Sequence, residues 1–432
     1  MLDIRDIRSN PEEYIQLLGF RGISRSEVES ILDIDSRAKE KLREVETLRS
    51  EIKSISKEVA KASRENKEDE VRELKEKSRV LGESSKDVES EFNSFSKQLN
   101  DELLNLPNIP SSECPVGKSE ADNLILNVNE PMKNFEHFQC VPHWEIGKEL
   151  GILDLERGAK LSGSMFPMFR KAGSKLLRAL TSFALDRHSD LFEEVRPPTL
   201  VKSDTLRSTG HLPKFSDEAY HIERDDLWAI PTAEVPLTSL FRDEILKESD
   251  LPKRFTAVTA CFRREAGAAG RDTRGLLRVH EFDKVEILAC TTKEQAPDIH
   301  LELLGRAESL VVELGLNYRV LDLCTMDLGQ SSRRTFDIEV YSPGTQKWLE
   351  VSSVSWFGDY QARRANLRYR PNDGSPIQFL HTLNGSALAW PRIFAALIEV
   401  YHQENGTIVL PDVLSSYLNG KRVIDLDGNL QF

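Results

Sequence analysis

The sequence lacks the features of a membrane or secreted protein. No apolar run in its 432 residues approaches the roughly 18 that a membrane-spanning helix needs. The opening Met-Leu-Asp-Ile-Arg-Asp-Ile-Arg has no apolar core region and is therefore no signal peptide. The five cysteines lie far apart without a paired spacing for zinc, and free thiols in a reducing compartment account for them most simply. We expect a cytoplasmic protein with no membrane segment.

Positively charged residues are also fewer than negatively charged ones. Lysine and arginine number 58 against 71 aspartates and glutamates, which leaves a formal net charge of −13. This balance argues against non-specific binding of nucleic acid by the whole surface, although it leaves room for a local basic stripe. The length allows about two or three domains.

Proline is absent between Val28 and Glu102, where Glu, Lys, Arg and Ser dominate. On both sides of a polar break at 63–69, apolar residues recur at intervals of three and four, with Ser78 and Ser85 filling two seam positions. The seam consists of Val45, Leu48, Ile52, Ile55 and Val59, then Val71, Leu74, Leu81, Val88, Phe92, Phe95 and Leu99. This pattern predicts two helices of about 45–55 Å each, paired as an antiparallel coiled-coil hairpin. We expect an N-terminal helical arm, 1–110, followed by a second domain, 111–432.

Such a seam more commonly serves as a dimerisation coiled coil or a spacer. The polar break stops each helix well short of a long parallel rod, which favours an arm. Basic residues gather toward its predicted tip, interleaved with glutamates: Lys53, Lys57, Lys61, Arg64, Lys67, Arg72, Lys75 and Lys77. Alone they are weak evidence for phosphate binding, because charged helix faces are usually just solvated.

The stretch 255–290 organises the second domain. β-Forming residues flank a loop with several glycines, Gly270 among them, which predicts two antiparallel strands joined by a long loop. Alternation would place Arg263 and Glu265 on one face of the first strand. On the return strand it would separate a mostly apolar face from a polar one: Leu277, Val279, Val285 and Ile287 against Arg278, His280, Phe282, Lys284 and Glu286.

The polar face suits an adenine nucleotide bound beside an amino acid. Arginine forks grip phosphate oxygens in pairs, an aromatic ring stacks on a nucleobase, and carboxylates hold an amine. The alternative is a solvated hairpin with ordinary surface ion pairs, the usual identity of a charged strand. The loop has too many glycines and arginines for a simple turn, which favours the binding surface.

A long match supports that interpretation. Phe262–Glu265 and Arg271–Glu286 resemble motif 2 of the class II aminoacyl-tRNA synthetases, in the version found in seryl-tRNA synthetases. Phe192–Val201, with Pro198, resembles motif 1, and Thr382–Arg392 resembles motif 3. The resemblance covers essentially the whole chain. It implies an α+β fold in which helices flank the class II antiparallel β-sheet, with the coiled-coil arm attached.

The resemblance implies an ATP site along motifs 2 and 3. Arg263 and Glu265 are the candidate catalytic residues: Arg263 would bridge the amino-acid carboxylate and the α-phosphate, and Glu265 would face the adenine amine. Phe282 would stack on adenine, while Arg278 and Arg392 would hold the β- and γ-phosphates. The remaining ATP-binding candidates are Arg264, Val279, Glu350, Val351, Ser352 and Ser353.

Magnesium would be held by Glu350 and Ser353, because Mg²⁺ beside phosphates takes few protein ligands, all of them oxygens. Motif 3 departs from the commonest family pattern, with Ala387 and Pro391 where glycines often stand. Since proline is tolerated only in the first turn of a helix, we expect the motif 3 helix to begin close to Pro391.

The implied amino-acid site takes L-serine. Its candidates are Thr232, Ala233, Glu234, Arg263, Glu286, Thr382, Asn384 and Ser386. Hydroxyl and carboxylate oxygens suit an ammonium group. From local sequence alone, Thr232 is more simply a helix N-cap, and the strand around Glu350 is more simply a strand with small packed residues.

The implied reaction activates L-serine with ATP and transfers it to tRNA(Ser) and, where that pathway exists, to tRNA(Sec). The enzyme would be a homodimer through motif 1, around Pro198. Three alternatives stay open: a class II synthetase for another amino acid, a paralog that loads a non-tRNA acceptor, and a non-catalytic coiled-coil binding protein. The coiled-coil arm and the Thr-Ala-Glu sequence favour serine over another amino acid. The basic residues of the arm argue against a paralog with a non-tRNA acceptor. The complete set of arginines and carboxylates argues against a non-catalytic binding protein.

Overall fold

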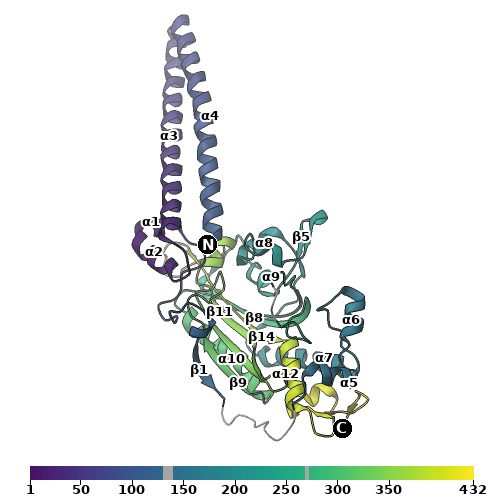
Figure 1. Cartoon of the computed structure of the whole chain (residues 1–432). Coiled ribbons are helices and arrows are strands. Elements are labelled where there is room, and N and C mark those ends of the chain that lie inside the picture. The colour runs from purple at the N-terminus through teal and green to yellow at the C-terminus, as the bar shows by residue number, and fades with distance from the viewer. Residues whose placement is uncertain (130–139, 268–271) are drawn as a thin grey trace. The chain divides into compact units, whose positions relative to one another are not determined.

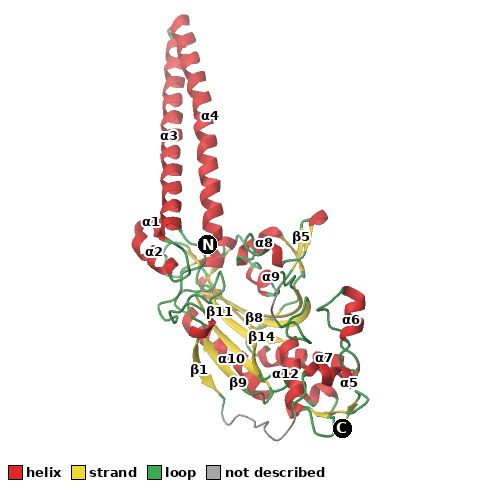
Figure 2. Cartoon of the chain, viewed as in Figure 1, coloured by secondary structure: helices red, strands yellow, loops and turns green. Residues whose placement is uncertain are grey.

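The computed structural model describes residues 1–129, 140–267 and 272–432. Gly270 and Arg271, which belong to the predicted loop of motif 2, lie outside the described residues. The chain forms two compact units, Leu2–Leu106 and Pro107–Phe432 together with Met1. Figure 1 follows them along the chain and Figure 2 shows their secondary structure. Within the described ranges, no helix has the length and apolar character needed to cross a membrane.

The first unit consists of four helices: α1 (Ile4–Ser9), α2 (Pro11–Gly19), α3 (Arg25–Arg64) and α4 (Glu68–Asn105). Ser24 begins α3 through a capping box, in which the Ser24 hydroxyl accepts from the Glu27 amide and the Glu27 carboxylate accepts from the Ser24 amide. With 40 and 38 residues, α3 and α4 are each about 57–60 Å long. The hairpin is therefore confirmed, and its helices are somewhat longer than predicted.

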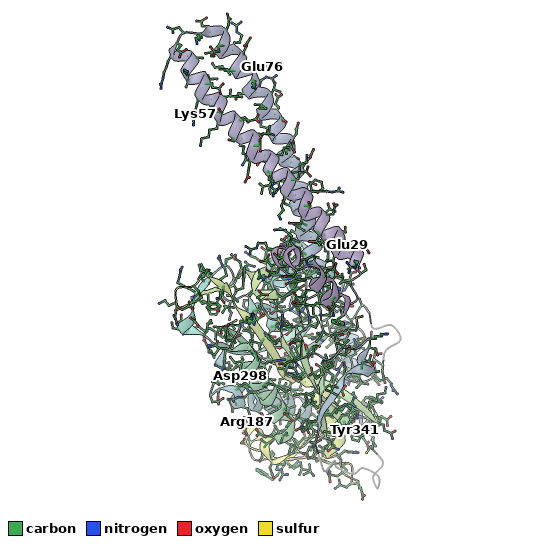
Figure 3. All side chains as sticks on the ribbon, turned by 90° about the vertical axis from the view of Figure 1, so that its left-hand side faces the viewer. Glu29, Lys57, Glu76, Arg187, Asp298 and Tyr341 are labelled. Carbon is green, nitrogen blue, oxygen red and sulfur yellow. The ribbon has the colours of Figure 1, made fainter. Side chains whose placement is uncertain are left out.

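The predicted seam of the hairpin is confirmed as well. Val45, Ile55 and Val88 are buried, and every other apolar seam residue is half-buried. Charged side chains such as Lys57 and Glu76 are exposed on the helices (Figure 3). The two helices therefore stabilise each other through one narrow apolar seam, with solvated charge elsewhere.

The second unit is built on an eight-stranded sheet. Its neighbours are antiparallel except for β2, which runs parallel to β7. Across the sheet the strands are β1 (Leu124–Val128), β9 (Tyr318–Asp322), β10 (Arg334–Ser342), β11 (Lys347–Trp356), β14 (His381–Ala389), β8 (Glu281–Thr291), β7 (Lys253–Phe262) and β2 (Glu193–Glu194). The predicted α+β fold with an antiparallel sheet is confirmed.

Three helices cover one face of this sheet and form the main core with it: α7 (Lys171–His188), α10 (Ala296–Glu313) and α12 (Trp390–Tyr401). Two short helices, α9 (Glu234–Thr238) and α11 (Tyr360–Ala365), pack on the other face near β7 and β8. The rest of that second face carries polar side chains, and the candidate site lies there.

Smaller elements complete the unit. The remaining helices are α5 (His143–Glu149), α6 (Leu155–Ser162) and α8 (Ser203–Thr209). Three small sheets contain β3 (Leu200–Lys202), β4 (His221–Ile222) and β5 (Leu227–Ala229); β6 (Ile245–Lys247), β12 (Arg368–Arg370) and β13 (Gln378–Phe379); and β15 (Ile408–Val409), β16 (Val423–Ile424) and β17 (Leu430–Gln431).

The antiparallel pair predicted for motif 2 is confirmed as β7 and β8, but its predicted extent is wrong. β7 ends at Phe262 and β8 begins at Glu281, so the segment 277–280 is not part of the return strand. Arg263 also lies beyond β7, and Glu265 adopts a left-handed backbone with φ of 50°. This conformation breaks the alternation that was expected to place Arg263 and Glu265 on one strand face.

Candidate active site

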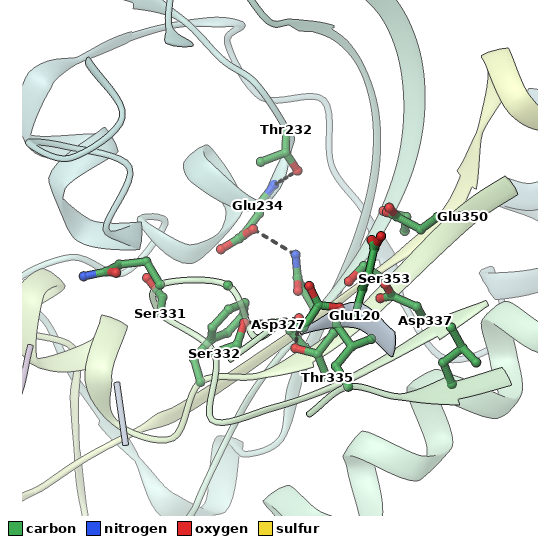
Figure 4. Close-up of a pocket in the computed structure, with 18 of the residues that line it drawn as sticks. Glu120, Thr232, Glu234, Asp327, Ser331, Ser332, Thr335, Asp337, Glu350 and Ser353 are labelled. Carbon is green, nitrogen blue, oxygen red and sulfur yellow. Dashed lines mark hydrogen bonds between the residues drawn. The ribbon is translucent and has the colours of Figure 1, made fainter. Parts of the chain in front are cut away.

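Two neighbouring hollows occupy the polar face of the sheet. The large hollow measures about 860 Å³ and is drawn in Figure 4. The small hollow measures about 200 Å³. Four residues line both of them: Arg263, Lys284, Glu350 and Ser386. The two hollows are thus adjoining compartments, and a ligand that reaches from one to the other would pass Arg263.

Two carboxylates lie close together at the large hollow: Glu234 lines it, and Glu286 is buried behind Glu234. The Asn384 side chain donates hydrogen bonds of 3.0 Å to Glu234 and 2.9 Å to Glu286. Thr232 donates its hydroxyl hydrogen to Glu286 at 2.9 Å and accepts from the Glu234 amide at 3.2 Å, the bond drawn in Figure 4. The interpretation of Thr232 as a helix N-cap is wrong, because the N-cap of α9 is Ala233. Thr232 lies one residue earlier and lines the large hollow.

The carboxylate pair is electrostatically unbalanced. Burial, together with the neighbouring charge of Glu286, raises the pKa of Glu234 to about 7. Lys284 pairs with Glu286 and donates to the Ser386 hydroxyl at 3.2 Å. One ammonium thus faces two carboxylates, and the pocket is suited to receive a second cationic group.

Some of the predicted serine-binding residues line neither hollow and instead contact residues that do, directly or through another side chain. Thr382 donates to the Gln361 side chain at 2.7 Å, and Gln361 in turn donates to Glu234 at 2.7 Å. Glu286 is fully buried and is reached through Thr232 and Asn384. Ala233 is packed in the apolar cluster beneath α9 and lines neither hollow.

The small hollow gathers the three arginines expected at the phosphates. Arg263, Arg278 and Arg392 all line it. The Arg263 guanidinium lies 5.3 Å from the centre of the Phe282 ring, a cation–π distance. Arg278 pairs with Glu265. The structure therefore brings these five residues around one compartment.

The other predicted ATP-binding residues fall into two groups. Val279, Val351 and Ser352 line the small hollow. Arg264 is exposed and lines neither hollow; its amide donates to the Glu218 carbonyl at 3.0 Å. Two arginines adjacent in sequence thus differ completely in their relation to the site.

A β-bulge brings the two predicted metal ligands to the same face of the sheet. In the pairing of β10 with β11, Glu339 faces Glu350 and Asp337 faces Ser353, so the register passes over Val351. Residues three apart on a regular strand point to opposite faces, whereas the extra residue of a bulge restores them to one face. Figure 4 shows Glu350, Ser353 and Asp337 gathered on this part of the sheet.

The donor set there fits a magnesium ion. Burial, with the charge of Glu350 beside it, raises the pKa of Asp337 well above its usual range. One carboxylate oxygen of Asp337 is buried with no hydrogen-bond partner among the residues that the structure describes. Among all the residues that the structure describes, no group of three or more His, Cys, Asp or Glu residues is arranged to bind a metal by itself. Few oxygen ligands, with room for water and phosphate, are what Mg²⁺ requires.

The motif 3 segment forms a strand followed by a helix, as predicted. β14 also contains a bulge, at Ala387, where the pairing with β8 moves from Ser386 to Leu388. The helix α12 begins at Trp390 with Pro391 in its first turn, which confirms the expectation for Pro391. Arg392 follows in that turn and donates to the Glu350 carbonyl at 2.7 Å.

Alternation placed Lys284 on the predicted polar face with Phe282 and Glu286, although no role was assigned to it. Two other residues of the site, Gln361 and His211, were not predicted from sequence. His211 lines the large hollow, and burial with the nearby Arg263 charge lowers its pKa to about 4, which keeps the ring neutral.

Comparison with known proteins gives a consistent result. Residues 215–401 match the family described as tRNA synthetase class II core domain (G, H, P, S and T), and residues 1–110 match the seryl-tRNA synthetase N-terminal domain. The chain is 43% identical over 424 residues to the serine–tRNA ligase of Herpetosiphon aurantiacus, covering 97% of this chain and 99% of that protein. It is 45% identical over 422 residues to that of Methylacidiphilum infernorum, covering 96% and 99%.

Solved structures are similar along the whole chain. The crystal structure of seryl-tRNA synthetase from Pyrococcus horikoshii complexed with ATP has a TM-score of 0.91 at 36% identity and covers 98% of this chain and 99% of that one. The cytoplasmic serine–tRNA ligase from Naegleria fowleri in complex with AMP has a TM-score of 0.83 at 26% identity, covering 96% of both chains.

Proposed function

The chain belongs to the seryl-tRNA synthetase family, and from this premise we propose that it activates L-serine with ATP and transfers the seryl group to tRNA(Ser). One observation carries the proposal. A hollow lined by Arg263, Arg278 and Arg392 adjoins a hollow lined by Glu234, and Asn384 joins Glu234 to the buried Glu286. The first compartment suits a triphosphate and the second suits an amino acid.

The first step requires alignment more than proton transfer. The serine carboxylate is already anionic at neutral pH, so its oxygen attacks the α-phosphorus while the bond to the β-phosphate oxygen breaks. Seryl-adenylate and pyrophosphate result. Arg263 lines both hollows and would neutralise the carboxylate and the α-phosphate together. Arg278 and Arg392 line the small hollow and would stabilise the departing pyrophosphate.

The serine ammonium would bind where Asn384 and Thr232 hold Glu234 and Glu286 in place. The serine hydroxyl would bind among the same polar groups. Lys284 pairs with Glu286 and supplies a positive charge beside it. An amino acid without a hydroxyl would leave buried polar groups unpaired, which disfavours its binding.

Magnesium would be held by Glu350 and Ser353, with Asp337 beside them. Bound Mg²⁺ supplies positive charge to the phosphates. The Arg392 guanidinium donates to the Glu350 backbone and lies 3.5 Å from the Glu350 carboxylate. This ion pair therefore fixes the position of the Glu350 carboxylate relative to the Arg392 guanidinium.

In the second step, the terminal ribose hydroxyl of tRNA attacks the seryl carbonyl and AMP leaves. We propose that residues 1–110 bind tRNA(Ser) through the basic tip of the α3–α4 hairpin, and that 111–432 carry the chemistry. The same recognition would extend to tRNA(Sec) where that pathway exists. We further propose a cytoplasmic homodimer that associates through the region around Pro198, which is exposed in the single chain.

A panel of amino acids in the ATP–pyrophosphate exchange assay tests the proposal. Exchange should depend on serine and Mg²⁺, and total tRNA should then be charged with serine. Exchange with a different amino acid would indicate another class II synthetase. Serine-dependent exchange without charging of tRNA would favour the paralog with a non-tRNA acceptor, and no exchange with any amino acid would favour a binding protein.

A further inference from the structure

A buried histidine connects three segments behind the small hollow. His143, in the first turn of α5, is fully buried. Its Nδ1 lies 2.7 Å from Glu399 Oε1, and its backbone amide donates to the same oxygen at 2.9 Å. The other oxygen of Glu399, a residue of α12, accepts from the Gly344 amide at 3.1 Å and from the Ser342 hydroxyl. The carboxylate therefore has donors on both oxygens.

These contacts determine which nitrogen of the ring carries the proton. A carboxylate only accepts, so the proton between His143 and Glu399 lies on Nδ1. The Leu276 amide donates to Nε2 at 2.9 Å, which requires an unprotonated Nε2. His143 is therefore the neutral Nδ1–H tautomer, and a proton on Nε2 would face the Leu276 N–H.

The backbone that His143 holds is the wall of the nucleotide compartment. Leu276, Leu277 and Arg278 all line the small hollow. The Leu277 carbonyl accepts from Arg392 Nε at 3.3 Å. The ring also packs directly against Gly275, where a Cβ would come within 2.3 Å of Nε2. This wall is thus held from behind by His143 and from the hollow side by Arg392.

We propose that His143 is a positioning residue for ATP. By accepting from Leu276, its Nε2 fixes the backbone that carries Arg278 and that anchors Arg392, so both guanidinium groups meet the phosphates in one geometry. Glu399 contributes by keeping the proton on Nδ1. The inference rests on the proposed function, because it concerns the nucleotide that this site takes.

Glu399→Gln gives the sharpest test. Each oxygen of Glu399 receives two donors, one of them a backbone amide, so the glutamine NH₂ faces a backbone N–H in either orientation. In the orientation that brings the NH₂ to the ring, it donates to Nδ1. Nδ1 then becomes an acceptor, the proton moves to Nε2, and the bond to Leu276 is lost. We expect the KM for ATP in serine-dependent exchange to rise by about tenfold, while the KM for serine changes by less than about twofold.

Three further variants separate positioning from general destabilisation. His143→Asn retains a donor near Nδ1 but loses the acceptor for Leu276, so it should behave as Glu399→Gln does. His143→Gln can offer an oxygen near Nε2 and should retain most ATP affinity. Ser342→Ala removes a donor from the same buried carboxylate without changing the tautomer, and its melting temperature can fall while its KM for ATP stays near the wild-type value.

The proposal would be overturned if Glu399→Gln and His143→Asn fold and keep the wild-type KM for ATP. It would also be overturned if Ser342→Ala raised the KM for ATP as much as they do, or if they raised the KM for serine in parallel. Calorimetric binding of ATP without serine gives a readout that needs no turnover. If the wild-type protein shows no serine-dependent exchange, the proposed function fails, whereas the ratio of ATP affinities between variants still tests His143.

Discussion

The side-chain amide of Asn384 lies 3.0 Å from the carboxylate of Glu234. Because the same amide also donates to Glu286, two carboxylates are held close together, with Glu234 lining the large hollow and Glu286 buried behind it. Their mutual repulsion adds to the effect of burial on Glu234, whose pKa rises to about 7. The site therefore contains an acid that titrates at physiological pH.

Serine binding should weaken as pH falls through 7. Glu234 must be ionised to hold an ammonium group, and below its raised pKa the carboxylate becomes protonated. The KM for serine should rise by roughly tenfold per pH unit below 7, measured in pyrophosphate exchange between pH 6 and 8. Glu234→Gln should show a high KM without this slope. A wild-type KM that stays constant over this range would contradict the assignment.

Arg263→Ala should reduce seryl-adenylate formation by about a hundredfold or more, because the charge shared by the attacking carboxylate and the α-phosphate loses its partner. Arg264→Ala is the matched control, since Arg264 is exposed and lines neither hollow. Single-turnover adenylate formation, with circular dichroism to verify folding, measures the difference. Equal rates in the two variants would refute the role of Arg263.

The enzyme should prefer serine over alanine by roughly 10⁴ in kcat/KM, because alanine leaves buried polar groups unpaired. Thr232→Val should reduce this preference, since it removes the donor to Glu286. The measurement is exchange with each amino acid at saturating ATP. Preference of only a few fold in the wild-type protein would mean that the pocket recognises the ammonium and carboxylate alone.

Glu350→Gln should raise the Mg²⁺ concentration for half-maximal exchange by about tenfold or more. The side chain loses its charge but keeps its size, so the bulged strand should stay intact. Asp298→Asn on α10, whose exposed side chain is labelled in Figure 3, is a control for the loss of one negative charge. If both variants show the wild-type Mg²⁺ dependence, Glu350 does not bind the metal.

Neutralising the tip of the hairpin should impair tRNA charging and spare adenylate formation. The variant replaces Lys61, Arg64, Arg72 and Lys75, all exposed near the turn, by alanine. We expect kcat/KM for tRNA to fall by tenfold or more, with a shallower dependence on salt. Replacing Lys86 and Lys97, which are exposed farther from the tip, should have little effect. An equal loss in both variants would point to bulk charge instead of a tRNA contact.

The sequence predicted well where the pattern is local. The apolar seam of α3 and α4 repeats over many turns, so periodicity alone identified the hairpin. Pro391 correctly predicted the start of α12. The predicted start of β8 was wrong for a related reason. Apolar and polar residues continue to alternate at 277–280, but alternation does not report whether a partner strand is there to form hydrogen bonds.

Features that depend on a distant partner could not be predicted. The bulge at Val351 exists only relative to the register of β10, so the spacing of Glu350 and Ser353 gave no sign that they share a face. Gln361 lies on α11 yet reaches Glu234 on α9, and His143 reaches Leu276 from α5. The raised pKa of Glu234 likewise follows from burial in the folded chain.

The bulges of β11 and β14 determine which changes of length these two strands tolerate. Each one holds one extra residue just beside the site, so deleting Val351 or Ala387 would leave a regular strand whose flanking side chains keep their faces. Adding a further residue without a new bulge would instead turn the side chains on one side of it toward the apolar core. Lineages of this enzyme are therefore expected to tolerate the loss of either bulge residue and to accommodate gained residues in the surface connections.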